Sequence, residues 1–219
     1  GYGVTVFEAG EQPGGMLEQC IPTFRLPREV LRNEVAYIEK LVVEFKTGVR
    51  VGKDISLEQI REQGYGAIVL ALGTQLGKRL GIPGEDGDGC YDALDFLRIV
   101  ISGGKLPAGD RLLVIGGGMS AMDVARTGRR LGMDVTVVYR RTKAEMPAVA
   151  EEVEDAEREG VKFQFLAAPL EIENEGGKVK AMISNRMELG EPDDSGRRRP
   201  VPIDGDNFKL DADFVVAAI

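Results

Sequence analysis

Histidine is absent from the sequence, and cysteine occurs only twice. The missing histidine removes the commonest general base and metal ligand, so any chemistry must come from a bound cofactor or from Asp, Glu, Lys, Tyr or Cys side chains. Cys20 and Cys90 stand far apart and form neither a C-x-x-C pair nor a metal-ligand spacing. We therefore expect two free, buried thiols in a reducing cytoplasm, and neither a redox dithiol nor a metal site held by this chain alone.

Long apolar runs and an excess of positive charge are also missing. No apolar stretch approaches the roughly 18 residues that span a bilayer, and no signal-peptide pattern opens the sequence. The 28 basic and 36 acidic residues give a net charge of −8, which argues against nucleic-acid binding as the main activity. With 219 residues, 43% hydrophobic and 29% charged, the composition predicts a cytoplasmic globular protein of one or two domains.

The most informative segment predicts a strand, a turn, a helix and a second strand in succession. A short apolar run at residues 112–115 ends at three glycines, and a segment without a helix breaker continues from there to Gly132. A run of Val and Thr at residues 135–138 then predicts the second strand. This order is typical of one βαβ unit.

The turn of this unit has the form G-x-G-x-x-G/A. Gly116 allows the sharp turn, Gly118 lets the backbone approach a pyrophosphate, and the small Ala121 lets helix and strand pack closely. The free N–H groups around Met119 and Ser120, at the positive end of the helix dipole, would hold the phosphates. Glycines after a strand also serve as plain structural turns, and it is the flanking elements that favour a dinucleotide site.

Two arginines, Arg140 and Arg141, stand at the end of the second strand. A site selective for NAD usually has an acidic residue there, about 20 residues after the glycines, which accepts from the ribose 2′-hydroxyl. Paired guanidinium groups suit a 2′-phosphate instead, because the planar fork offers several donors and a permanent charge. The pair favours NADP(H), and a solvated basic strand end is the alternative.

The beginning of the sequence predicts a second dinucleotide fold. Residues 4–7 form a buried-strand run that ends on Glu8, the residue type that binds a ribose at the end of the second strand of such a fold. The strand and glycine turn that come first in the fold are not in the sequence. Residues 214–219 form an apolar strand with no turn after it. We therefore expect the chain to be a fragment in which this fold is incomplete at both ends.

Periodicity and breaker residues predict the remaining elements. Helices are expected at residues 28–45, from Ser56 onward, at 91–101 and at 149–159, the last with an acidic, solvated face. Strands are expected at residues 49–51, at 67–72 as a central parallel strand, and at 161–165. Residues 82–89 predict a linker, and Gly176 and Gly177 join two predicted hairpin strands, 170–174 and 178–183.

Several of these motifs together carry a resemblance to one family. They are the strand end at Glu8, segments 14–17 and 21–27, the run 71–73 before 82–86, the glycine turn with residues 121–123, residues 139–141 with 145–148, and the loop 188–202. With them the chain resembles the glutamate synthase small (β) subunit family. It is also similar to the NADPH-side domains of dihydropyrimidine dehydrogenase and of NADPH:ferredoxin flavoprotein subunits. The resemblance covers nearly the whole chain.

The resemblance implies an α/β fold of two Rossmann-like dinucleotide-binding domains in a glutathione-reductase-like arrangement. Residues 1–75 would be a partial FAD-binding domain, and residues 76–219 an NADP(H)-binding domain. On the FAD side, the implied cofactor-binding residues are Glu8, Gly15, Leu17, Arg25, Ala71 and Gly73. The remaining implied cofactor-binding residues are Gly116, Gly118, Met119, Ser120, Ala121, Arg140, Arg141, Ala218 and Ile219. No catalytic side chain and no metal ligand is implied, and Met119 departs from the polar residue that the family commonly has.

The resemblance further implies a parent protein that transfers hydride from NADPH to FAD. It would pass electrons through iron–sulfur clusters, held outside this chain, to a larger partner subunit or domain; neither a nucleic acid nor a membrane is expected as a partner. The cofactors carry such chemistry, while the protein positions them. A dinucleotide-binding module that senses or scaffolds without turnover is the alternative.

Overall fold

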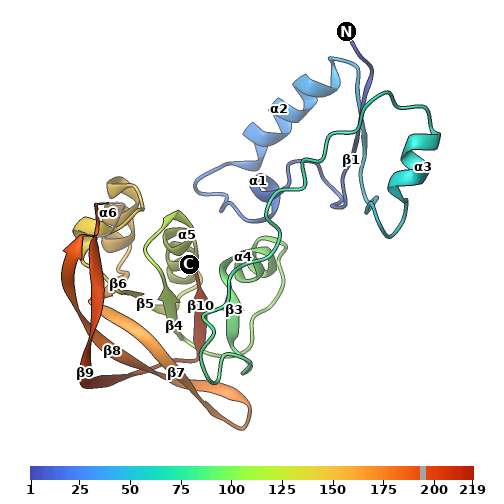
Figure 1. Ribbon diagram of the computed structural model, residues 1–219. Helices are drawn as coiled ribbons and strands as arrows, with labels where there is room; N and C mark the ends of the chain where they lie inside the picture. Colours follow the sequence, from blue (N-terminus) through green and yellow to red (C-terminus); the bar gives the residue numbers. More distant parts are fainter. Residues whose placement is uncertain (193–195) are drawn as a thin grey trace. The chain divides into compact units, whose positions relative to one another are not determined.

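The computed structural model describes residues 1–192 and 196–219, and Figure 1 shows the course of the chain. The described residues divide into two compact units, Gly1–Gln75 and Leu76–Ile219. The assignment of FAD to the first and NADP(H) to the second stays a prediction. Residues 193–195 of the predicted hairpin loop lie outside the described residues.

A small parallel sheet of two strands forms the first unit's framework. β1 (Val4–Phe7) pairs with β2 (Val43–Lys46), and the connection between them contains α1 (Met16–Gln19) and α2 (Arg28–Glu39). α3 (Leu57–Glu62) follows β2. Ser56 is its N-cap, as predicted, because the Ser56 hydroxyl accepts from the Gln59 N–H and the Gln59 side chain accepts from the Ser56 N–H.

The helix predicted at residues 28–45 is too long. α2 ends at Glu39, and Val42 adopts a φ of 66°, a left-handed conformation that L-residues rarely take. Residues 43–46 are extended instead, since they pair with all four residues of β1. The pairing with a strand distant in sequence has overridden the local helical spacing.

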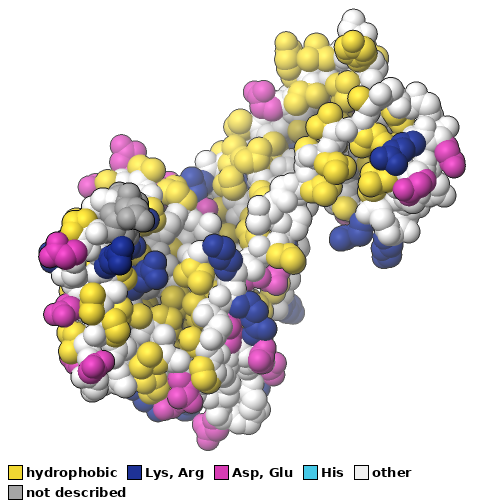
Figure 2. All heavy atoms as spheres, in the orientation of Figure 1, with side chains coloured by type: hydrophobic (Ala, Val, Ile, Leu, Met, Phe, Trp, Pro, Cys, Tyr) yellow, Lys and Arg dark blue, Asp and Glu magenta, His cyan; other side chains and the backbone are white. Residues whose placement is uncertain are grey.

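Residues 67–72 form no strand in the structure, contrary to the prediction. Val69 is 86% exposed and Leu72 68%, and hydrophobic side chains, yellow in Figure 2, lie on the visible face of this unit. A strand needs hydrogen bonds to a neighbour, and within the described chain β1 pairs only with β2. An apolar run without a partner therefore stays irregular. The strand predicted at 49–51 is likewise reduced to a bridge between Val51 and Ile55.

The second unit is built on a five-stranded parallel sheet with the order β3-β10-β4-β5-β6. These strands are β3 (Cys90–Asp92), β10 (Phe214–Ala217), β4 (Arg111–Ile115), β5 (Asp134–Tyr139) and β6 (Lys162–Phe165). The predicted βαβ unit is confirmed, because α5 (Met119–Arg130) joins the parallel neighbours β4 and β5. α5 also contacts α4 (Ala93–Ile101) and α6 (Ala150–Arg158) on either side.

A three-stranded antiparallel sheet packs against the parallel sheet. It consists of β7 (Ala167–Glu175), β8 (Lys178–Pro192) and β9 (Arg198–Asp211), and Figure 1 shows it as the orange and red ribbons. The predicted hairpin turn at Gly176 and Gly177 joins β7 and β8. The shared core combines Leu113, Ile115, Val138 and Val215 of the parallel sheet with Ile172, Val179 and Met182 of the antiparallel one. This burial holds the two sheets together.

The predicted linker at residues 82–89 is folded onto β7 and β8. The Pro83 carbonyl accepts from the Ile172 N–H at 2.9 Å, and a Cβ at Gly84 would lie 1.9 Å from the Ile172 carbonyl oxygen. The Asp88 N–H donates to the Gly177 carbonyl at 2.8 Å. The Gly and Pro residues therefore permit close packing of this segment rather than flexibility.

The acidic helix predicted at 149–159 is only partly solvated. Val153 and Ala156 are buried, and Arg126 of α5, 6% exposed, forms ion pairs with Asp155 at 3.2 Å, Glu159 at 2.8 Å and Glu152. A buried guanidinium needs such partners, because it would otherwise lose its hydration without compensation. The acidic residues of α6 are thus partly explained by the α5–α6 contact.

Candidate functional site

The first two glycines of the β4–α5 turn are required by the fold itself. Gly116 has a φ of 142°, and a Cβ there would lie 2.1 Å from the carbonyl oxygen of Ala218. A Cβ at Gly117 would lie 2.6 Å from the ring of Tyr139. Neither position accommodates a side chain, so these glycines would be explained without any ligand.

Gly118 is different. Its φ of −92° is open to any residue, and the nearest atom to a Cβ there would be Pro147 Cγ at 4.0 Å. Gly118 is the N-cap residue of α5 and provides no side-chain cap. The starts of α2 and α6 also lack one, whereas α3 and α4 have Ser56 and Asp92 as capping residues. The start of a twelve-residue helix is thus left with backbone donors and open space, an arrangement suited to an anion brought close to the backbone.

Residues 139–149 line one side of this turn. The Tyr139 hydroxyl donates to the Glu145 carbonyl at 2.8 Å, and the Ala148 N–H donates to the Gly117 carbonyl at 3.1 Å. The Thr142 hydroxyl donates to the Glu145 carboxylate, and this hydrogen bond is the largest cause of the lowered pKa of Glu145. Desolvation opposes the lowering, and the hydrogen bond from the Thr142 N–H adds to it. The predicted motif at 145–148 is thereby held beside the glycines.

Met119 and Ala121 have packing roles that the structure makes explicit. The Val149 N–H donates to Met119 Sδ at 3.3 Å, so Met119 helps to hold the 145–149 segment. Ala121 is fully buried, as its predicted role in close packing requires. Ser120 is exposed in the first turn of α5. Sequence analysis missed Gly128, where a Cβ would lie 2.5 Å from Leu112 Cδ2; a glycine inside a predicted helix is the signal for such a contact.

The two predicted arginines lie in different environments. Arg140 is exposed, whereas Arg141 is only 5% exposed and its Nε donates to the Arg198 carbonyl of β9 at 2.7 Å. At the other side of the turn, the Ala218 N–H donates to the Ile115 carbonyl at 2.8 Å, which brings Ala218 next to Gly116. Ile219 is 60% exposed. The second unit therefore gathers the predicted residues of the NADP(H) side around one end of the parallel sheet, except that the Arg141 side chain is turned into the protein.

The predicted FAD-side residues are more dispersed within the first unit. The Glu8 carboxylate follows β1 and accepts from the Gly10 N–H at 2.6 Å. Gly15 precedes α1 with a φ of 53°, and Leu17 on α1 is 44% exposed. Ala71 belongs to the exposed apolar run, and Gly73 follows it directly.

Arg28, which sequence analysis did not single out, organises the segment around Arg25. Its two terminal nitrogens donate to the Ile21 carbonyl at 2.7 Å and the Leu26 carbonyl at 3.1 Å, and its Nε lies 3.3 Å from the Glu18 carboxylate. Arg25 is partly buried in the same segment. An arginine directly after Pro27 at a helix start is the only signal that the sequence offers for this role.

Neither cysteine supplies a redox pair. Neither forms a disulfide bond; Cys20 is buried and Cys90 is partly buried. Burial, followed by the charge of Glu85, raises the pKa of the Cys90 thiol to about 11. Among the described residues no cluster of three or more His, Cys, Asp or Glu side chains could hold a metal ion. None of the helices in the described part of the chain combines the length and apolar character that a membrane crossing requires.

Comparison with known proteins places the chain in a family. A family model described as pyridine nucleotide-disulphide oxidoreductase matches residues 1–219. The chain belongs to this family. This membership confirms the predicted dinucleotide-binding α/β fold and the predicted oxidoreductase class. The predicted cofactors, FAD and NADP(H), are consistent with the family.

Relatives by sequence include proteins with the predicted family name. The chain is 46% identical to the NADP(+)-dependent formate dehydrogenase subunit beta of Moorella thermoacetica over its whole length and covers 31% of that protein. It is 38% identical to the NADPH glutamate synthase small chain of Escherichia coli, again over its whole length, and covers 49% of it. The resemblance predicted from the motifs is confirmed. The chain spans about a third to a half of the length of these relatives.

Solved structures show the same fold at lower identity. FprA from Mycobacterium tuberculosis superposes with a TM-score of 0.80 at 23% identity, covering 99% of this chain and 64% of that one. Thioredoxin reductase from T. acidophilum gives a TM-score of 0.64 at 15% identity, covering 100% and 69%. At such identities the likeness concerns the fold alone.

Proposed function

We propose that the second unit binds NADP(H) with its pyrophosphate against the start of α5. The observation that carries this proposal is Gly118, which lies at an uncapped helix start and has no neighbour in the chain that requires a glycine. Backbone approach by a phosphate gives a reason for glycine at this position. Gly116 and Ala121 shape the turn, while Met119 and Ser120 belong to the first turn of the helix.

The 2′-phosphate would lie at the end of β5. Arg140 is exposed there and carries a permanent charge, and no acidic residue stands in its place to select a 2′-hydroxyl. Ala218 and Ile219 would border the nucleotide from the β10 side, because Ala218 adjoins Gly116. The relatives named NADPH- or NADP(+)-dependent support this choice of cofactor.

The first unit would contribute to an FAD site as part of a larger domain, with residues 1–75 on the FAD side and residues 76–219 on the NADP(H) side. Glu8 would accept from the FAD ribose at the end of β1, as the acidic residue at this position does in dinucleotide folds. Its present partner is a backbone N–H, so the second carboxylate oxygen remains for the ribose. Further contacts would come from Gly15, Leu17, Arg25, Ala71 and Gly73.

The parent protein would be an oxidoreductase that oxidises NADPH and transfers electrons onward. FAD, when bound, supplies the hydride acceptor, while the residues of this chain bind and orient the two dinucleotides. We infer that the electrons pass through iron–sulfur centres to a larger subunit. The relatives named as a subunit beta and as a small chain support the presence of a further subunit.

The experiment that tests this function is an absorbance spectrum of the purified full-length parent. We expect the bands of oxidised flavin, and their loss when NADPH is added without oxygen. NADH at the same concentration serves as the control and should bleach the flavin much more slowly. A parent that binds NADPH but contains no flavin would instead be a sensor or scaffold.

A further inference from the structure

Met119 is the first residue of α5, and its side chain contacts a segment that lies beside the glycine turn. Its Sδ accepts from the Val149 N–H at 3.3 Å. Val149 is the N-cap residue of α6, so this bond joins the first turn of α5 to the start of α6. A thioether carries no charge and no donor, and its sulfur is a weak acceptor. The Met119 side chain therefore offers a phosphate no hydrogen bond of its own.

The segment of residues 146–149 borders the open space at Gly118. The Ala148 N–H donates to the Gly117 carbonyl at 3.1 Å, which ties the segment to the turn. Pro147 Cγ is the nearest atom, at 4.0 Å, to a Cβ built on Gly118. A phosphate above Gly118 would therefore have Pro147 beside it. The position of the segment determines how much room the phosphate has.

The two ends of this part of the chain are held by bonds of different strength. Before the segment, the Glu145 carboxylate accepts from the hydroxyl and the N–H of Thr142, and the Tyr139 hydroxyl donates to the Glu145 carbonyl at 2.8 Å. A charged acceptor makes the stronger hydrogen bonds. At the far end, the Val149 N–H has the neutral sulfur of Met119 as its acceptor. The position of the far end therefore depends on the side chain at residue 119.

We propose that Met119 is a positioning residue, whose sulfur holds residues 146–149 at the distance from Gly118 that the pyrophosphate of NADP(H) requires. This role rests on the proposed NADP(H) function and deepens it. Met119 acts through Pro147 and Ala148, and the backbone N–H groups at the start of α5 bind the phosphate. Its contribution concerns the pyrophosphate alone, and the adenosine end of the nucleotide is bound independently of it.

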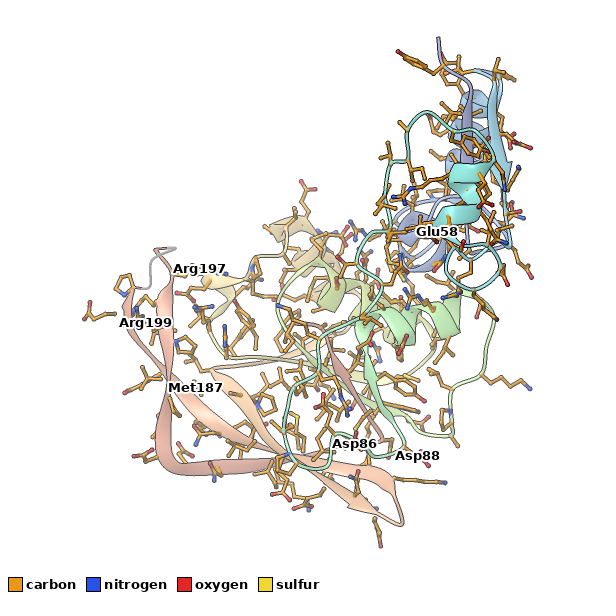
Figure 3. All side chains as sticks on the ribbon, turned by 45° about the vertical axis from the view of Figure 1, so that its right-hand side comes forward. Glu58, Asp86, Asp88, Met187, Arg197 and Arg199 are labelled. Carbon is orange, nitrogen blue, oxygen red and sulfur yellow. The ribbon has the colours of Figure 1, made fainter. Side chains whose placement is uncertain are left out.

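The test uses variants of the full chain that remove either partner of the Met119–Val149 bond. Met119→Leu keeps an apolar side chain of similar size without the acceptor, and Met119→Gln restores an acceptor on an unbranched side chain of similar length. Val149→Pro removes the donor at a φ of −62°, which proline adopts. The matched control is Met187→Leu, because Met187 is 9% exposed on β8 and Figure 3 shows it on the antiparallel sheet.

Three quantities are measured for each variant: the dissociation constants of NADPH and of adenosine 2′-phosphate, which has no pyrophosphate, and the exchange rate of the Ala148 amide. We expect Met119→Leu to speed this exchange and weaken NADPH binding by about threefold to fivefold each, as for one lost neutral hydrogen bond. Binding of adenosine 2′-phosphate should stay unchanged. Met119→Gln should restore both quantities, and Met187→Leu should resemble the wild type. Val149→Pro should match Met119→Leu, and the double variant should be no weaker than either single variant.

Wild-type NADPH affinity in Met119→Leu would overturn the proposal, and so would an equal weakening of NADPH and adenosine 2′-phosphate, which indicates a general loosening of the unit. Additive losses in the double variant would also count against it. If Val149→Pro does not fold, the comparison of Met119→Leu with Met119→Gln decides, and equal NADPH affinities of these two would refute the role. If the wild type binds neither ligand, the proposed function fails, and the exchange data still show whether Met119 holds the segment.

Discussion

Three consecutive glycines in the β4–α5 turn have three separate physical reasons. Gly116 avoids the Ala218 carbonyl, Gly117 avoids the Tyr139 ring, and Gly118 has no tight neighbour at all. The sequence predicts the turn because the G-x-G-x-x-A pattern follows an apolar strand. It does not distinguish the two glycines that packing requires from the one that lets a ligand approach the backbone. Ala218 and Tyr139 come to lie beside the turn only when the sheet forms, so the local pattern does not show them.

Substitution separates these roles. We expect Gly118→Val to fold and to weaken NADPH binding by about 100-fold or more, because a branched side chain would occupy the place of the pyrophosphate. Gly116→Ala should instead destabilise the protein by about 1–3 kcal/mol, because its Cβ meets a carbonyl at an unfavourable φ. Thermal unfolding followed by circular dichroism and a binding titration measure the two effects.

Gly66→Val provides the matched control for Gly118→Val. A Cβ at Gly66 meets nothing within 4 Å, and this residue lies in the first unit. The control should bind NADPH like the wild type. A folded Gly118→Val variant that also binds at wild-type affinity would show that the nucleotide lies elsewhere.

At the scale of elements, the insertion of β10 between β3 and β4 brings the last strand into the middle of the sheet. An ion pair fixes this insertion at the strand starts. The Asp213 carboxylate accepts from the Arg111 guanidinium at 2.7 and 3.1 Å and from the N–H groups of Asp110 and Arg111. The hydrogen bond from Arg111 is the largest cause of the strongly lowered pKa of Asp213, which burial opposes.

We expect Asp213→Asn to lower the free energy of unfolding at neutral pH by about 1–2 kcal/mol, since the side chain is partly solvated and its charge is screened. The folded-state pKa lies below the unfolded value of about 4, so this stabilisation is present above pH 4 and is lost as the pH falls towards the folded pKa. Urea unfolding of wild type and variant at several pH values measures it. A difference that stays constant down to about pH 3 would contradict the assignment.

Local signals predicted some elements and failed for others for a common reason. Apolar runs and glycines within the sequence mark the bounds of β4, α5 and β5, and Gly176 and Gly177 mark the turn of the β7–β8 hairpin. β2 and residues 67–72 depend on whether a partner strand lies beside them. The position of β10 in the sheet is equally non-local. Pairing between distant segments leaves no mark in a short window of sequence.

At the scale of the whole molecule, the two units differ in how far their apolar residues are buried. The second unit encloses its sheet between helices and an antiparallel sheet, and residues such as Phe96, Leu112 and Phe214 are almost fully buried there. The first unit has Leu31 and Ile60 buried but exposes Val69, Leu70 and Leu72. We therefore expect the second unit to be more stable on its own than the first.

This contrast leads to an expectation for cofactor retention by the 219-residue chain. The second unit contains a strand, a glycine turn and a twelve-residue helix in the order that a dinucleotide pyrophosphate requires. Within the described first unit, β1 leads instead to a four-residue helix, and residues 67–72 offer no strand beside it. An FAD pyrophosphate would thus lack both the glycine turn and the helix dipole in this chain.

We therefore predict that this chain binds NADP(H) but purifies without flavin. The visible absorbance spectrum of the purified chain measures the flavin, and titration with NADPH measures the other site. As a control, the chain is incubated with excess FAD and passed through a desalting column, after which it should again be colourless while NADPH binding persists. A stoichiometric yellow complex would mean that Glu8, Gly15 and Arg25 hold FAD without a pyrophosphate turn, and that contacts to the ribose and flavin outweigh those to the phosphates.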